Sequence, residues 1–299
     1  MLIAMLVGWL VAGVPPEVVA ETPTPALTGR WLDPMEAVGT IDGAEVRGEV
    51  RVYVPAGYEA AGETGAEGKA YPLVLALHGW DHSPAMFVEK GGLGELADKY
   101  GVVVAVPETG RSIFETSFYR QTKSKWTKAP GARWVGEVVL PWLRANVRVS
   151  GEKARTAVIG YSTGGRGAFL LAALYPEFGY VGSVSGTYDL MALDPKTGEY
   201  RIHSVIYGKR EKHAERWAKD NVMAKQHLAK LAGLHVYVGH GDKDKAVPSE
   251  QMTLFEAAAK KVGFVSQAFV TTKGGGHDWA LWNAHWPAMF EGFSKSMGR

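Results

Sequence analysis

The segment 156–174, TAVIGYSTGGRGAFLLAAL, is the part of the sequence that leaves the fewest choices of local structure. It begins with a short apolar, β-branched run, breaks at Gly160 and presents Ser162. Two glycines then lead into a Leu-rich stretch of small residues. This order predicts a strand, a sharp turn and a helix.

Gly160, Ser162 and Gly164 form the pattern Gly-x-Ser-x-Gly, in which a serine on a tight turn needs neighbours without side chains. The next helix starts almost at once, so its free backbone N–H groups and positive dipole end lie near Ser162. The pattern also arises by chance in a chain with 37 glycines, which leaves an ordinary turn serine as the alternative. The flanking strand and helix favour a nucleophile. A second serine-rich turn, at residues 182–186, lacks the spacing and is predicted to be structural.

Composition narrows the class of protein. A chain of 299 residues with 46% hydrophobic and 21% charged residues can bury a sizeable core, and no repeat argues for two domains. The formal charge of +2 comes from interspersed charges without a long basic run, so we expect no nucleic-acid partner. The absence of cysteine excludes disulfides, thiolate metal sites and a cysteine nucleophile.

The amino terminus resembles an export signal. Residues 1–14 are apolar and uncharged, two prolines follow, and Val18-Val19-Ala20 resembles a small-residue cleavage site. We expect a signal peptide over residues 1–20, cleavage near Ala20 and a secreted or periplasmic protein. The run is too short to span a membrane. It lacks the usual preceding Lys or Arg, so a buried strand or helix is the alternative.

Residues 21–45 are expected to form a linker and an edge element, followed by a single domain over residues 46–299.

Strand and helix patterns alternate through that domain. The continuous apolar run at residues 72–77 is typical of a strand buried on both faces of a parallel sheet. Residues 186–231 interrupt the alternation and are expected to form a small helical cap over the carboxyl edge of the sheet. Strands are expected at 49–54, 72–77, 102–106, 157–159, 180–185, 234–238 and 265–270, and helices at 93–100, 131–146, after Ser162, at 249–262 and at 280–296. The predicted fold class is α/β, with a mostly parallel central sheet flanked by helices.

Two loops at strand ends are candidates for the site. His78-Gly79-Trp80-Asp81-His82 follows a central strand, where open α/β sheets hold their sites, and is expected to donate hydrogen bonds. Residues 108–130 are irregular and rich in aromatic side chains, which fits pocket lining and local packing equally well.

A serine nucleophile needs a base, and the base needs an orienting carboxylate. Two later turns supply candidates: residues 240–248 hold Asp242 and Asp244, and residues 274–279 hold His277. The order Ser, Asp, His is the one expected on an α/β-hydrolase sheet.

Four stretches together resemble a known group of proteins. GYSTGG, HGDKDKAVP, GGGHDWALW and LALHGW are similar to the esterase D and enterochelin-esterase branch of the α/β-hydrolases, from about residue 50 to the end. The resemblance implies acyl chemistry, although the family also includes acyltransferases. By its motifs, the resemblance implies that Ser162 is the nucleophile, His277 the base and Asp244 the acid. It also implies that the backbone N–H groups of Trp80 and Thr163 form the oxyanion hole.

Other roles for these residues remain open. Asp242 is the alternative acid, or else a turn-former. A metal site at His240, Asp242 and Asp244 is disfavoured because adjacent ligands lack a paired histidine motif. Trp279, Trp282 and Trp286 recur at helical spacing, which favours a core position over a substrate platform.

The sequence therefore predicts a serine hydrolase of carboxylic esters that uses no cofactor or metal. Small-molecule or carbohydrate esters, including aryl and feruloyl esters, are the expected substrates. The alternatives are an acyltransferase that uses a sugar acceptor and a non-catalytic binding protein that kept the fold. The sequence does not indicate an oligomeric state.

Overall fold

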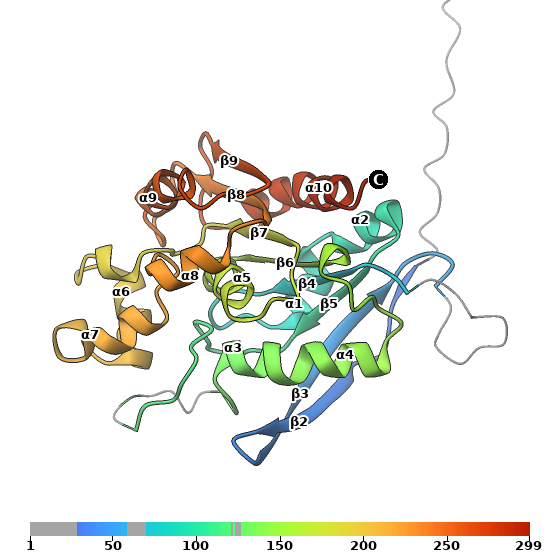
Figure 1. Ribbon diagram of the computed structural model, residues 1–299, viewed down its shortest axis with the longest axis horizontal. Helices are drawn as coiled ribbons and strands as arrows, with labels where there is room; N and C mark the ends of the chain where they lie inside the picture. The colour runs from blue at the N-terminus through green and yellow to red at the C-terminus, as the bar shows by residue number, and fades with distance from the viewer. Residues whose placement is uncertain (1–28, 59–69, 121, 123–126) are drawn as a thin grey trace, which may run out of the picture.

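The computed structural model describes residues 29–58, 70–120, 122 and 127–299, and this part of the chain forms one sheet with helices on both faces (Figure 1). The strand order is β1-β3-β5-β4-β6-β7-β8-β9, and β2 pairs with β3. Strands β4 to β9 run parallel, whereas β1, β2 and β5 pair antiparallel with β3. The strands are β1 (Arg30–Trp31), β2 (Met35–Ile41), β3 (Ala44–Val54), β4 (Leu73–Leu77), β5 (Val103–Pro107), β6 (Thr156–Tyr161), β7 (Tyr180–Val184), β8 (His235–Gly241) and β9 (Ser266–Thr272).

Strand β4 shows why the middle of the sheet is apolar throughout. Leu73, Leu75 and Leu77 belong to the hydrophobic cluster on one face, and Val74 and Ala76 belong to the cluster on the other. Successive strand residues point to opposite faces, so a strand covered on both sides must be apolar at every position. The predicted α/β class is confirmed.

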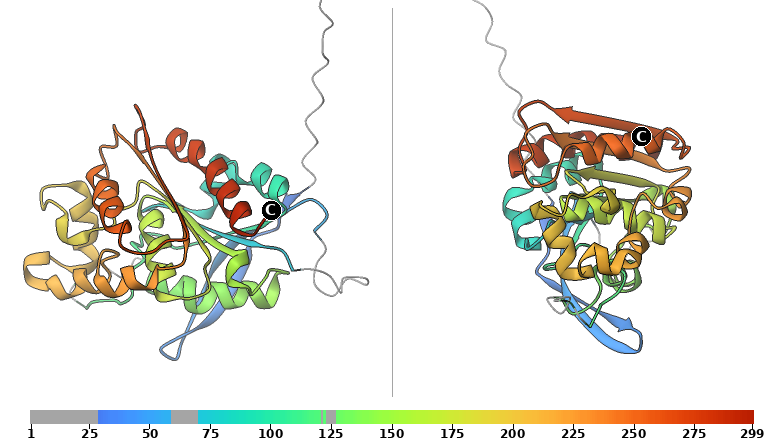
Figure 2. Two further views of the ribbon diagram at one scale, coloured as in Figure 1. Left: turned by 45° about the horizontal axis from the view of Figure 1, so that its top comes forward. Right: turned by 90° about the vertical axis from the view of Figure 1, so that its left-hand side faces the viewer.

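Helices cover both faces, as the turned views show (Figure 2). One face carries α1 (Pro84–Lys90), α2 (Leu93–Tyr100) and α10 (Trp279–Ser296). The other face carries α3 (Gly131–Arg133), α4 (Leu140–Asn146), α5 (Thr163–Leu174), α8 (Lys225–Lys230) and α9 (Glu250–Ala259). Within the described residues, no helix is both long enough and apolar enough to cross a bilayer.

The helix expected over residues 131–146 is present, but its middle, Trp134–Val139, is a π-helix between α3 and α4. Pro141 lies in the first turn of α4 and has no N–H to offer the carbonyl one turn earlier. The wider π turns accommodate this missing hydrogen bond, as is common at such insertions.

Residues 45 and 46, between which the domain is expected to begin, both lie in β3 of a β-hairpin. β3 begins at Ala44, which pairs with Ile41 of β2. Asp42 and Gly43 form the turn, with φ angles of 52° and 78°, and Asp-Gly is a strong signal for such a hairpin. The expected edge element is therefore a hairpin that continues into the domain. The predicted signal peptide lies outside the described residues and stays a prediction.

The insertion at residues 186–231, which is predicted to cap the carboxyl edge of the sheet, consists mostly of short helices. It holds the short 3₁₀ turn Leu190–Ala192 together with α6 (Gly198–Tyr207), α7 (Arg210–Lys219) and α8. Figure 1 shows α6 and α7 beyond the edge of the sheet at the left, while α8 lies beside α5 in the flanking layer. A small hydrophobic cluster joins the insertion to the irregular loop at residues 108–130. Its members are Ile113 of that loop and Leu190, Leu193, Tyr200, Ile206, Tyr207 and Trp217 of the insertion.

Candidate active site

Ser162 occupies a strained turn between β6 and α5. Its φ of 57° and ψ of −127° lie in a region that residues with a side chain rarely adopt. A side chain at Gly160 would collide with the carbonyl of Gly164, and one at Gly164 would collide with the carbonyl of Leu77. The turn therefore needs both glycines, for the steric reason expected from the motif.

Three side chains from three strand ends form a continuous hydrogen-bonded chain. Ser162 Oγ lies 3.0 Å from Nε2 of His277, in the turn after β9. His277 Nδ1 lies 2.7 Å from Oδ2 of Asp244, in the turn after β8. Asp244 accepts a hydrogen bond from the N–H at Nδ1 of His277. Nε2 is then unprotonated and can accept a hydrogen bond from the Ser162 hydroxyl.

Asp244 is held as a buried carboxylate. Its side chain has no exposed surface, and Oδ1 accepts the backbone N–H groups of Ala246 and Val247 at 2.9 Å each. Burial alone raises the pKa of Asp244, but the hydrogen bonds from His277 and Val247 outweigh it and hold the pKa below its usual value. The ionised form is therefore the one that orients His277.

His240 lies behind this carboxylate. Its Nε2 is 3.1 Å from the carbonyl of Val247 and 3.5 Å from Oδ2 of Asp244. Burial lowers the pKa of His240, so the ring is neutral at neutral pH and donates to the carbonyl.

Asp242, the alternative acid, is exposed and has a different partner. Its Oδ1 accepts the backbone N–H of Gly274 at 2.7 Å, which joins the two loops that carry Asp244 and His277. The structure thus brings Asp244 and not Asp242 to His277. No three His, Cys, Asp or Glu side chains of the described residues are arranged to hold a metal ion.

The two expected N–H donors both belong to segments next to Ser162. Thr163 is the first residue of α5, where backbone N–H groups point out of the helix. Trp80 follows Gly79, and a Cβ on Gly79 would lie only 3.1 Å from Cβ of Ser162. The turn after β4 therefore passes directly beside the serine.

Aromatic rings surround the histidine. Trp282 meets the His277 ring edge to face at 5.3 Å and stacks on Tyr161 at 4.0 Å between ring centroids. Trp282 and Trp286 are buried in the core, whereas Trp279 is half-buried. The tryptophan block is therefore mainly core, with Trp279 at its margin.

Where it is described, the irregular loop at residues 108–130 both lines a cavity, through residues 108–110 and 127–129, and packs in the interior. Ile113 and Phe114 are fully buried, and Tyr119 packs on Tyr207 of α6 with ring centroids 6.2 Å apart.

Two side chains near the serine, those of His82 and Tyr161, have no role that could be assigned from the sequence. His82 Nδ1 lies 2.7 Å from the hydroxyl of Tyr161. Burial lowers the pKa of His82, and the neighbouring charge of His277 lowers it further. Tyr161 is part of the GYSTGG motif and His82 ends the expected donor loop, but the two residues are 79 positions apart and neither segment signals their pairing.

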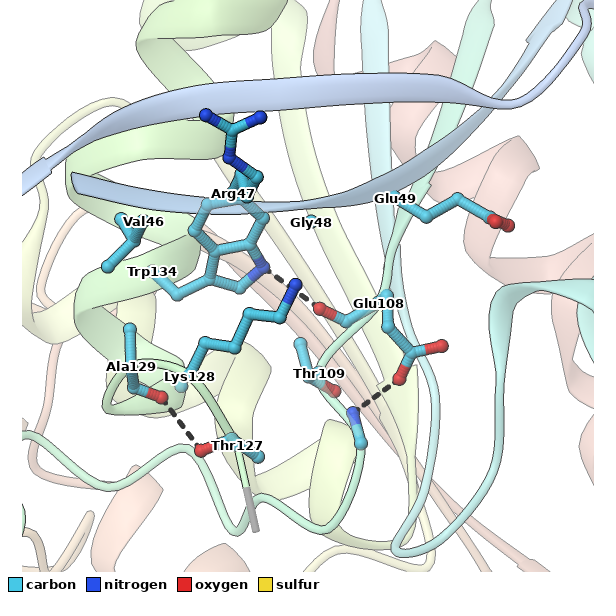
Figure 3. A pocket seen from close by; sticks show the side chains of 12 residues that line it. Val46, Arg47, Gly48, Glu49, Glu108, Thr109, Thr127, Lys128, Ala129 and Trp134 are labelled. Atoms are coloured by element: carbon cyan, nitrogen blue, oxygen red, sulfur yellow. Dashed lines mark hydrogen bonds between the residues drawn. The ribbon is translucent and has the colours of Figure 1, made fainter. Parts of the chain in front are cut away.

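A separate cavity of about 230 Å³ lies between β3 and the end of β5 (Figure 3). Trp134 donates its indole N–H to the carbonyl of Glu108 at 2.9 Å, and Lys128 points into the space. Ser162, Asp244 and His277 do not line this cavity, so it is distinct from the hydrogen-bonded chain.

The chain resembles known proteins in sequence and in fold. The chain is 26% identical over 238 residues, or 71% of this chain and 69% of the relative, to the diacylglycerol acyltransferase/mycolyltransferase Ag85B of Mycobacterium leprae. Its fold is similar to an S-formylglutathione hydrolase from Agrobacterium tumefaciens, with a TM-score of 0.68, 18% identity and coverage of 92% and 98% of the two chains. It is also similar to a ferulic acid esterase, with a TM-score of 0.65, 19% identity and coverage of 91% and 99%.

The family model named Esterase, described as "Putative esterase", matches residues 44–293, most of the chain. Its match covers the segments that carry Ser162, Asp244 and His277. Family membership supports ester hydrolysis as the general activity, in agreement with the resemblance found in the motifs. The chain belongs to the Esterase family.

Proposed function

We propose that this protein hydrolyses carboxylic esters through an acyl-serine intermediate on Ser162. The hydrogen-bonded chain from Ser162 through His277 to the buried Asp244 carries this proposal. It supplies a nucleophile, a base within reach of its proton, and a carboxylate that fixes the tautomer of the base.

The reaction follows from these contacts. His277 Nε2 takes the proton of Ser162 as Oγ attacks the ester carbonyl, and Asp244 stabilises the imidazolium that forms. The backbone N–H groups of Trp80 and Thr163 would bind the oxyanion, each worth on the order of 3 kcal/mol. The intermediate then collapses, and the alcohol leaves with the proton from His277. A water molecule, deprotonated by His277, then attacks the acyl-serine. The acyl–Oγ bond breaks, Ser162 Oγ takes the proton back from His277, and the carboxylic acid is released.

A substitution at the serine tests this assignment. Ser162→Ala should lower kcat by several orders of magnitude and abolish labelling by a fluorophosphonate probe. Ser266→Ala is a matched control, because Ser266 also pairs with a histidine, His235, at 2.8 Å, but on the exposed edge of the sheet. The proposal fails if the probe still labels Ser162→Ala, or if both variants turn over esters as the unmodified protein does.

The proposed substrates are carbohydrate or aryl esters, including feruloyl esters. The half-buried Trp279 and the rings around His277 provide an apolar, aromatic border for such groups. A panel of short-chain, long-chain and feruloyl esters tests the class. Preference for long aliphatic esters over every aryl or carbohydrate ester would contradict it.

Acyl transfer to a sugar is the second candidate, favoured by the similarity to the mycobacterial acyltransferase. Hydrolysis and transfer share the acyl-serine and differ in the acceptor that resolves it. Partitioning of the acyl group between water and glucose or trehalose at millimolar concentration separates them. Capture of most of the acyl group by the sugar, with slow hydrolysis, would identify a transferase.

A further inference from the structure

The hydroxyl of Tyr161 is a buried polar group that the proposed mechanism does not use. Tyr161 ends β6, directly before Ser162, and is fully buried. Its ring stacks on Trp282, and its hydroxyl lies 2.7 Å from Nδ1 of His82. A buried hydroxyl that pairs with a side chain of a separate loop can fix the position of that loop.

That loop is the turn after β4, which carries Trp80. The N–H of His82 donates to the carbonyl of Gly79 at 3.2 Å and closes the turn. Asp81, inside the turn, has a φ of 59°, a left-handed conformation that is unfavourable for a residue with a side chain. Its ion pair with Arg111, at 2.8 Å, is exposed to solvent and gives the turn little support. The turn therefore depends on its buried contacts.

Tyr161 contacts the turn at both ends. A Cβ on Gly79 would lie 3.0 Å from Cε2 of Tyr161, so the first residue of the turn packs on the edge of the ring. At the other end of the turn, the Tyr161 hydroxyl lies 2.7 Å from Nδ1 of His82 and can donate to this nitrogen when the ring proton is on Nε2.

We propose that the Tyr161 hydroxyl is a positioning group that holds the Gly79–His82 turn so that the N–H of Trp80 points at the oxyanion. This inference rests on the proposed function, because it assumes the acyl-serine chemistry of Ser162. Tyr161 is the residue directly before Ser162 in the chain. Through this link it sets the distance between Ser162 Oγ and the N–H of Trp80, which would stabilise the oxyanion formed by the attack. A donor displaced from the oxyanion loses most of its effect on the transition state and little of its effect on the bound ester.

Tyr161→Phe removes the hydroxyl and keeps the ring that stacks on Trp282. We expect kcat to fall roughly tenfold to a hundredfold, less than the loss on removing an oxyanion donor outright, with KM changed less than about threefold. A trifluoromethyl ketone, which forms a tetrahedral adduct with the serine, should bind more weakly by a similar factor.

Tyr237→Phe is the matched control. Tyr237 is also a buried tyrosine of the same core cluster, and its hydroxyl lies 2.7 Å from Nδ1 of a histidine, His285. The Tyr237→Phe variant therefore loses an equivalent tyrosine–histidine hydrogen bond, but one that does not involve the Gly79–His82 turn. We expect this variant to lose stability as Tyr161→Phe does, but to keep the kcat and the ketone affinity of the unmodified protein.

His82 provides a second route if Tyr161→Phe does not fold. His82→Ala breaks the same hydrogen bond from the half-buried side and should reproduce the loss in kcat, whereas His82→Gln offers an amide oxygen to the hydroxyl and should restore part of it. The inference is wrong if kcat and ketone affinity are unchanged in Tyr161→Phe, or in His82→Ala, or if the variants raise KM alone. Fluorophosphonate labelling of Ser162 in all of them separates this result from failure of the proposed function, in which Ser162 itself would not be labelled.

Discussion

The Nδ1 nitrogen of His277 lies 2.7 Å from the Oδ2 oxygen of Asp244, although 33 residues separate them in the chain. The two residues meet because β8 and β9 are parallel neighbours, so the turns that follow them leave the same edge of the sheet. Asp242 links these turns from outside by accepting the N–H of Gly274. The two aspartates therefore have separable roles.

We expect Asp244→Asn to lower kcat roughly 10³- to 10⁴-fold, because an amide can hold His277 in the wrong tautomer and does not stabilise the imidazolium. Asp242→Asn keeps an oxygen that can accept from Gly274 and should change kcat less than about threefold. Steady-state kinetics of both variants tests the assignment. A large loss in Asp242→Asn together with a small loss in Asp244→Asn would reverse the two roles.

Gly164→Ala should disrupt the turn that carries Ser162, because the added methyl group would collide with the carbonyls of Leu77 and His78. We expect the free energy of unfolding to fall by roughly 1–3 kcal/mol, as in overpacked cores. We also expect most of the activity to be lost. Gly151→Ala is the control, since a Cβ there meets no atom within 4 Å. Thermal unfolding and kcat measured side by side would contradict this prediction if Gly164→Ala behaved like Gly151→Ala.

Local patterns in the sequence were sufficient to predict the turn that carries Ser162 and the buried strands of the parallel sheet. The glycines around Ser162 and the uninterrupted apolar run of β4 are each visible in a few consecutive residues. The order of the motifs along the chain, Ser, Asp, His, is the one expected on an α/β-hydrolase sheet. The Asp42-Gly43 hairpin was also visible locally, but the polar composition around it favoured a linker.

Features that depend on distant contacts could not be predicted in this way. The pairing of His82 with Tyr161 joins residues 79 positions apart and has no sequence pattern. The choice between Asp242 and Asp244 came from the family resemblance, since both follow the same strand. The π-helical turns arise from the fit of Trp134–Val139 against β2 and from Pro141, which periodicity alone does not show.

Stability should fall as the pH falls below neutrality, because two buried histidines resist protonation in the folded protein. Burial lowers the pKa of His203 from 6.5 to about 3, and that of His78 from 6.5 to about 4. The unfolded chain takes up these protons below pH 6.5 and the folded protein does not. The free energy of unfolding therefore decreases from about pH 6.5 down to about pH 3–4, by on the order of 3 kcal/mol for His78 alone.

Urea unfolding at about pH 7 and about pH 5 measures this effect. His203→Leu removes one of the two groups and should reduce the difference in unfolding free energy between the two pH values. An unchanged or larger difference in His203→Leu would show that His203 does not contribute. A free energy of unfolding that rises on acidification would contradict the sign of the whole prediction.

Arg166 should anchor the helical insertion to the helix that follows the nucleophile. Arg166 lies in α5 and is fully buried. Its guanidinium donates to the carbonyl of Ile113 in the irregular loop, to the carbonyl of Asp220 and to the hydroxyl of Tyr207 at 3.1 Å. The carboxylate of Asp220 in turn accepts from Tyr207 at 2.9 Å, so one cation connects three segments.

Arg166→Met would leave these acceptors buried without their donor, and we expect a loss of stability of about 3–5 kcal/mol. The loss should be local, because most of the hydrophobic side chains of the held segment belong to a small cluster separate from the two main clusters of the sheet. Limited proteolysis should therefore cleave within residues 186–231 first. Lys219→Met is the control: Lys219 joins the same insertion to Ser117 of the same loop at 2.7 Å, but at an exposed position. Since exposed pairs contribute little, that variant should stay within about 0.5 kcal/mol of the unmodified protein. Equal losses in the two variants, or cleavage of Arg166→Met that begins elsewhere, would show that burial of the guanidinium is not what fixes the insertion.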